Sequence, residues 1–203
     1  MEFNLKSTEA AGERFFRQYY KHCTAPDNDT LFNFLNSAHS LNDKIEKSHG
    51  KGFFDIEEFT VVKALRNIFH HEGELINEVR VIPVEELPPI TTDLAFLCLV
   101  PSSLIEQSFE SIPKKYREKE EKIISSKVQW YGSVVNINPC LFNFAVKVYE
   151  AITENSIKVE GPDFKELENS YNFEIQNGYS HYVTGKIFCS AGDAEDVFRV
   201  LFA

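Results

Sequence analysis

The chain has 203 residues, of which 43% are hydrophobic, including 18 Phe and 8 Tyr. This length and composition predict a globular domain with a substantial core and exclude a disordered segment. The 31 acidic residues outnumber the 21 Lys and Arg, which gives a formal charge of −10. This charge disfavours nonspecific binding of nucleic acid, because phosphate contacts need clustered cations. The one dense basic run, 114–122, is interleaved with glutamates and is typical of a solvated helix face.

The cysteine pattern and the lack of long apolar runs indicate the compartment. Four cysteines lie far apart and form no Cys-x-x-Cys pair: Cys23, Cys98, Cys140 and Cys189. We find no signal peptide, and the longest apolar run, 94–100, is too short for a bilayer. We therefore expect a cytoplasmic protein with free thiols and no membrane partner.

Two amphipathic helices are predicted at the start of the chain. Ser7 or Thr8 would cap the first helix, which runs through Cys23. Asp27 or Asp29 would cap the second, which runs to about residue 49.

A third helix follows the glycines of 50–52. Asp55 and Glu58 have the spacing of a capping box at its start, and Gly73 offers a left-handed residue at its end. Apolar residues at helical spacing predict its buried stripe: Val61, Val62, Leu65, Ile68 and Phe69. Short loops favour antiparallel packing of these three helices.

The pattern changes after the third helix. Residues 77–82 and 93–100 predict strands, separated by an irregular connection rich in proline. A helical stretch begins at 101 and is interrupted by Pro113, while 128–135 is ambiguous between strand and loop. Asn138 and Pro139 are a typical helix start and predict the fourth helix of the bundle.

The last segment predicts a β-hairpin and a short helix. Residues 171–175 and 179–189 would pair around the Asn177-Gly178 turn, and Asp193 would cap a helix over 194–201. The expected fold class is mainly α, α+β overall. A helical domain over 1–156 forms a four-helix bundle with a small β-containing insertion at about 76–136, and a short α/β C-terminal extension, 157–203, packs on the same domain.

The polar face of the third helix carries the candidate site. Six residues three or four positions apart project from it: Lys63, Arg66, Asn67, His70, His71 and Glu74. The pattern Arg66-Asn67-x-x-x-His71 resembles the motif of the HEPN superfamily (higher eukaryote and prokaryote nucleotide-binding domains). The resemblance implies a HEPN-like helical bundle, usually a homodimer, in which two copies of the motif face each other. Active members cut RNA without a metal ion, and many act in host defence or as toxins with an antitoxin partner.

The residues fit this chemistry. A ribose 2′-hydroxyl attacks the neighbouring phosphate, so the site needs a group that exchanges protons and a cation for the phosphorane charge. The imidazole of His71 exchanges protons near neutral pH, and the Arg66 guanidinium offers a fixed fork for phosphate oxygens. Asn67 would orient the histidine or the phosphate. His70, one turn from Arg66, would assist or replace His71.

Other interpretations stay open at this point. Arg66 could pair with Glu74, Asp43 or Glu46, which would make the motif structural. The acidity and the aromatic content also fit a noncatalytic HEPN-like module that binds another protein. Trp130 and Tyr131 could stack a base or belong to the core.

A metal site and a cofactor site are disfavoured. The four candidate ligands for a metal are His70, His71, Glu72 and Glu74. Adjacent residues on a helix point roughly 100° apart and do not converge on one ion. We find no glycine-rich phosphate loop, so no cofactor is expected.

Overall fold

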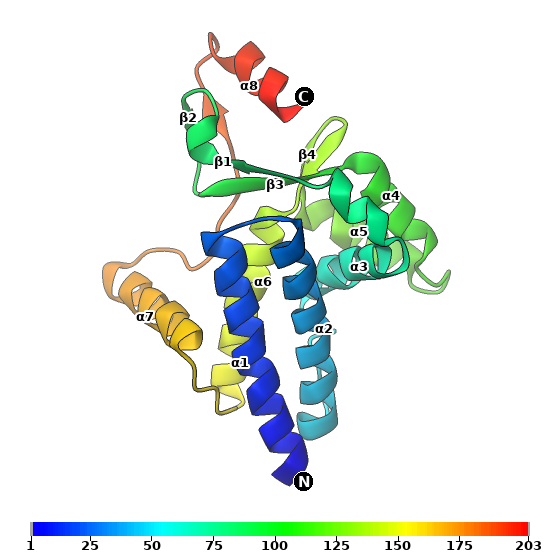
Figure 1. Ribbon diagram of the computed structural model, residues 1–203, viewed down its shortest axis with the longest axis vertical. Helices are drawn as coiled ribbons and strands as arrows, with labels where there is room; N and C mark the ends of the chain where they lie inside the picture. Colours follow the sequence, from blue (N-terminus) through cyan, green and yellow to red (C-terminus); the bar gives the residue numbers. More distant parts are fainter. Residues whose placement is uncertain (1, 203) are drawn as a thin grey trace.

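The computed structural model describes residues 2–202, with the side chains of residues 5–73 and 75–202. Four helices share one core: α1 (Glu2–Thr24), α2 (Asn28–His49), α3 (Glu57–His71) and α6 (Asn138–Glu154). Figure 1 shows α1 and α2 side by side and antiparallel, with α6 behind them and the sheet across their upper ends. The predicted class, mainly α with a small amount of β, is confirmed.

Phenylalanine rings join the four helices. Phe15 of α1 packs against Phe34 of α2 and Phe144 of α6, with ring centroids 5.4 and 5.8 Å apart. Phe59 of α3 stacks on Phe144 at 5.7 Å. All four rings are at most 1% exposed. Aromatic pairs at these separations stabilise the core beyond the area they bury, so this cluster fixes the position of α3 against the rest of the bundle.

The two long helices start differently from one another. Asp27 caps α2, accepting a hydrogen bond from the Thr30 amide at 2.7 Å while the Thr30 hydroxyl bonds the Asp27 amide. This cap was among the predicted ones. The predicted caps of the first helix, Ser7 and Thr8, are wrong, because α1 already begins at Glu2. The buried Thr8 hydroxyl instead donates to the Lys44 carbonyl of α2 at 3.1 Å.

The predicted boundaries of the third helix are correct within two residues, but its predicted caps are wrong. The N-cap position of α3 is Ile56, which forms no side-chain capping bond. Asp55 pairs with Lys51 at 2.7 Å, and Glu58 is buried among lysines. Gly73 has no positive φ, because α3 ends at Glu72 in a tighter 3-10 turn, η1 (Gly73–Glu78). The predicted apolar stripe of this helix is buried throughout.

A four-stranded antiparallel sheet follows, in the order β1-β3-β5-β4. Its strands are β1 (Arg80–Pro83), β3 (Phe96–Pro101), β4 (Gln129–Tyr131) and β5 (Val134–Asn136). In β3, Cys98 and Val100 face the helical core, whereas Leu97 and Leu99 face a second, smaller core. The sheet is thus covered on both faces, as the continuous apolar run predicted. The ambiguous stretch 128–135 forms a hairpin that turns at Gly132, whose φ is 72°.

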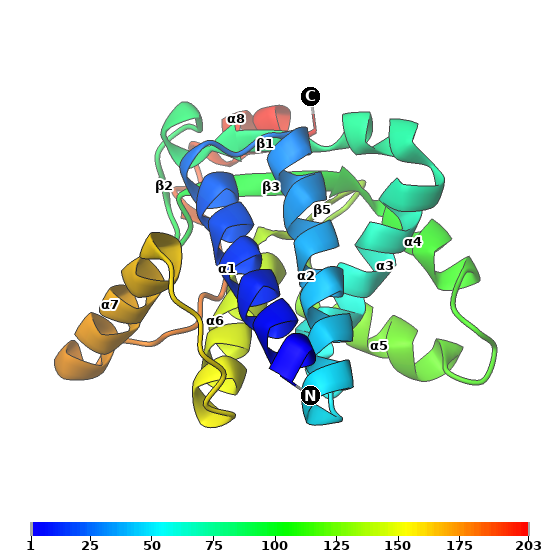
Figure 2. The ribbon, with the colours of Figure 1, turned by 60° about the horizontal axis from the view of Figure 1, so that its bottom comes forward.

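Two helices of the insertion lie beside α3. They are α4 (Ser102–Glu110) and α5 (Arg117–Lys127), and both contact α3 along its length. Figure 2 shows them on the side of α3 opposite to α1. A 3-10 turn, η2 (Val84–Glu86), lies in the proline-rich connection before β2 (Ile90–Thr91).

The predicted C-terminal hairpin is wrong. Residues 162–177 form a helix, α7 (Pro162–Asn177), which packs against α1. Gly178 is left-handed, with φ 68°, but it caps α7 and does not turn a hairpin. An Asn-Gly pair fits both uses, since each requires positive φ at the glycine. The short strand β6 (Phe188–Cys189) pairs with β2 instead.

The last predicted helix is present as α8 (Ala194–Leu201). Val197 and Leu201 bury its apolar face in the second core, on the outer side of the sheet. Figure 1 shows α8 at the top of the molecule, at the end opposite to the N-terminus.

Candidate functional site

The polar side of α3 lies between α2 and α5. On the α5 side, the Lys63 ammonium bonds both carboxylate oxygens of Glu120 at 3.1 Å. Both side chains are largely buried, 28% and 18% exposed, so this ion pair covers the part of the polar face that lies against α5. The charge of Lys63 is therefore satisfied within the fold.

Arg66, one turn further along α3, has a different environment. Its Nη1 donates a 3.3 Å hydrogen bond to the amide oxygen of Asn67, and its Nε is buried with no hydrogen-bond partner. Among the side chains that the structure describes, no carboxylate forms an ion pair with Arg66. The alternative partners Asp43 and Glu46 are therefore wrong, whereas Glu74 lies outside the described side chains. A half-buried guanidinium without an anion has its remaining donors available to a ligand.

His39 of α2 completes this part of the face. Burial lowers the pKa of His39, and the nearby positive charges of Arg66 and Lys63 lower it further, against the opposing effect of Asp43. The Asp43 carboxylate lies 3.7 Å from the His39 ring. Sequence reasoning missed His39, because nothing in the pattern of α2 shows which of its faces meets α3.

The two histidines of the motif lie at the open end of α3. His70 and His71 are both exposed, and their ring centroids are 5.6 Å apart at an interplanar angle of 71°. His70 is four residues from Arg66 and shares its face, whereas His71 lies roughly 140° around the helix. On the regular helix α3, His70 therefore lies nearest to Arg66 around the axis, Asn67 follows at roughly 100°, and His71 is the farthest of the three from Arg66.

The other end of α3 holds a compensated charge cluster. Glu58 is 4% exposed and accepts bonds from Lys147 at 2.7 Å and Lys127 at 3.1 Å. Burial raises the pKa of Glu58, but the hydrogen bonds from Lys147 and Lys127 outweigh burial, so the pKa lies below its ordinary value. This carboxylate serves to join α3, α5 and α6.

Two of the cysteines are not activated as nucleophiles, and no cluster of metal ligands is found among the described side chains. Burial raises the pKa of the Cys98 thiol to about 12 and that of Cys23 to about 11. Thiols of this kind stay protonated and unreactive at neutral pH. No group of three His, Cys, Asp or Glu side chains within residues 5–73 and 75–202 is placed to hold a metal ion.

Two further observations concern features singled out by the sequence. Trp130 is 38% exposed and its indole donates to the Ser125 carbonyl at 3.0 Å, so its interpretation as a core residue is wrong. No helix within residues 2–202 combines the length and the apolar character needed to cross a bilayer.

Comparison of the chain with models of protein families, with curated proteins and with solved structures finds no match.

Proposed function

We propose that this protein binds and cleaves RNA through the open end of α3, as a metal-independent endoribonuclease of defence or toxin–antitoxin type. The observation that carries the proposal is the uncompensated guanidinium of Arg66. In a chain of net charge −10, Arg66 is half-buried with no carboxylate partner among the described side chains. Two exposed imidazoles follow it within one and a half turns of helix. A fixed cation beside groups that exchange protons is what cleavage of a phosphodiester requires.

Each residue has a role in the proposed reaction. The guanidinium of Arg66 binds the phosphate oxygens and stabilises the charge that develops on them. Asn67, which already accepts a bond from Arg66, holds the guanidinium in place. A histidine takes the proton of the ribose 2′-hydroxyl, and a second protonates the leaving 5′-oxygen. The products are a 2′,3′-cyclic phosphate and a free 5′-hydroxyl.

The divergence of Arg66 and His71 favours a homodimer as the active form. On a single helix the two residues lie roughly 140° apart around the axis, so one copy of α3 does not present both on the same side. In a twofold dimer, Arg66 and His70 of one copy would face His71 of the other. The site would then combine both histidines with a guanidinium.

The test is incubation of the purified protein with total RNA in EDTA. We expect cleavage that leaves 2′,3′-cyclic ends, and a loss of at least about 100-fold in rate for Arg66→Ala and for His71→Ala. Arg199→Ala, which removes an exposed arginine of α8, is the matched control and should cleave normally. Activity retained in both site variants would rule out the proposed site.

A noncatalytic module that binds another protein is the second candidate. It is favoured by exposed aromatic rings at the C-terminal end, where Phe188, Phe198 and Phe202 are 62%, 52% and 46% exposed. Clustered exposed apolar side chains commonly mark protein interfaces. No RNA cleavage and no RNA binding by the wild-type protein, together with a protein complex lost on Phe198→Ser, would favour this candidate.

A further inference from the structure

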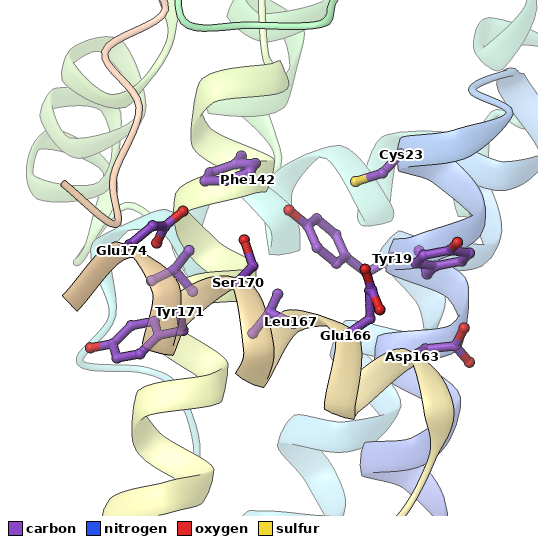
Figure 3. A pocket seen from close by; sticks show the side chains of 11 residues that line it. Tyr19, Cys23, Phe142, Asp163, Glu166, Leu167, Ser170, Tyr171 and Glu174 are labelled. Atoms are coloured by element: carbon purple, nitrogen blue, oxygen red, sulfur yellow. The ribbon is translucent and has the colours of Figure 1, made fainter. Parts of the chain in front are cut away.

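A concave site lies on the opposite side of the bundle from α4 and α5. It is a cavity of about 190 Å³ enclosed by α1, α6 and α7. Figure 3 shows the residues of α7 along one wall, Phe142 of α6 behind them and Cys23 of α1 beside it. The proposed RNA site uses none of these residues.

The interior of this cavity is apolar and aromatic. Tyr19 and Phe142 lie with ring centroids 6.3 Å apart, inclined at 64°. Val146 and Leu167 add aliphatic surface, and Tyr20, which is 43% exposed, stands at the edge. A volume of this size admits a group of several carbon atoms, and aromatic rings attract a cation placed over them.

Carboxylates carry all of the formal charge around the cavity. Asp163, Glu166 and Glu174 line it, and its eleven lining residues include no Lys, Arg or His. Glu174 is bonded to His181 at 2.7 Å from outside. Within the described part of the chain, Asp163 and Glu166 form no ion pair. Two carboxylates at the rim of an aromatic cavity thus have no cation of their own.

We propose that this cavity binds an organic cation with a short apolar body. The apolar part fills the space between Tyr19, Phe142 and Leu167, and an ammonium or guanidinium group meets Asp163 and Glu166 at the rim. Anionic compounds of the same size are disfavoured by repulsion from the carboxylates at the rim. The cation is either a free amine or a basic side chain of a peptide, since both offer the same chemistry.

The experiment is a titration of the full-length protein with 2-phenylethylammonium. Binding is measured by calorimetry and by ligand-observed NMR. Phenylacetate, of the same size and opposite charge, is the paired probe. We expect saturable binding of the amine that weakens with salt, and none of the carboxylate. A peptide with an acetylated N-terminus and a single lysine next to phenylalanine distinguishes the sources. Tighter binding of the peptide than of the amine indicates a side-chain ligand, and the reverse indicates a free amine.

Three pairs of variants locate the site. Glu166→Gln should weaken binding about fivefold by removing one exposed charge at the rim. Glu168→Gln, on the same helix but outside the cavity, should not. Ser170→Lys introduces a cation at the exposed lining position and should abolish binding, whereas Asn169→Lys should leave it intact.

Arg66→Ala should leave amine binding unchanged, and Glu166→Gln should leave RNA cleavage unchanged, so failure of either proposal is separable from the other. Three results would overturn this assignment. Phenylacetate could bind as well as the amine, or neither the amine nor the lysine peptide could show saturable binding. Alternatively, the lining variants Glu166→Gln and Ser170→Lys could lose no more binding than their controls Glu168→Gln and Asn169→Lys.

Discussion

The two ends of α3 differ in whether a buried charge has a partner of opposite sign among the described side chains. In the first turn, Glu58 is buried and receives bonds from Lys127 and Lys147, which come from α5 and α6. Two turns later, Arg66 is half-buried, and its side-chain partner among the described residues is the amide oxygen of Asn67. Burying a charge costs free energy unless a partner compensates for it. The first end is therefore organised for folding, and we propose that the second end is organised to receive a ligand.

The largest effect should follow from breaking the compensated end. Glu58→Ala leaves the partly buried Lys147 without its anion and Lys127 with only the exposed Glu57, and should lower the free energy of unfolding by about 3 kcal/mol. Urea unfolding at neutral pH measures this change. Glu57→Ala is the matched control, because Glu57 also pairs with Lys127, at 2.7 Å, but is 54% exposed. A similarly large loss in the control would mean that the burial of Glu58 is not the cause.

His22 extends the comparison to a buried group that is only half satisfied. Its Nδ1 lies 3.1 Å from the Thr30 hydroxyl, and its Nε2 has no partner. Burial lowers the pKa of His22 to about 4, a small opposing effect coming from Asp27. As the pH falls, His22 therefore binds a proton near pH 6.5 in the unfolded chain but only near pH 4 in the folded protein.

The contribution of neutral His22 is fully present above pH 6.5 and is lost as the pH falls from 6.5 toward 4. The loss should reach about 3 kcal/mol. Urea unfolding from about pH 7.5 to about pH 4.5 should show this slope in the wild type and a shallower one in His22→Gln, which does not titrate there. Parallel slopes would show that other groups govern the acid transition.

The starts of α2 and α3 offer a comparison of smaller size. Asp27→Ala removes the side-chain acceptor of the Thr30 amide in the capping box of α2, leaves the backbone amide of residue 27 bonded to the Thr30 hydroxyl, and should cost about 1 kcal/mol. Asp55→Ala, before the uncapped start of α3, removes only an exposed pair with Lys51 and should leave stability nearly unchanged. Thermal and urea unfolding of both variants measure the difference. Equal losses would contradict the assignment of the caps.

The same contrast explains what the sequence could predict. The apolar stripe of α3 and the buried run of β3 follow from local periodicity, and both were predicted correctly. The role of Glu58 was not, because a carboxylate three residues after Asp55 has the spacing of a capping box. Its real partners, Lys127 and Lys147, are 69 and 89 residues away, a separation that no local pattern reveals.

The prediction of a C-terminal hairpin was wrong for a related reason. Asn177-Gly178 specifies a left-handed residue but not whether a strand or a helix precedes it. The helix was decided by the packing of α7 on α1, where Phe164 meets Phe16 with ring centroids 5.0 Å apart. The candidate site combines residues that local spacing brings together with one that it does not. Arg66 and His70 lie one turn apart on α3, a proximity that follows from their spacing, whereas His39 is added from another helix.

Arg66 provides the smallest expected change in stability and the sharpest test of the comparison. If its charge is held for a ligand, Arg66→Met should leave the free energy of unfolding unchanged or raise it by up to about 1 kcal/mol, because an unpaired half-buried charge is replaced by an apolar chain. RNA binding by the same variant should fall at least tenfold, measured by titration of labelled RNA at fixed salt. Lys63→Met, which leaves Glu120 without its partner, should instead lose stability. A loss of stability in Arg66→Met as large as that in Lys63→Met would place Arg66 among the residues that hold the fold together, and the distinction between the two ends of α3 would disappear.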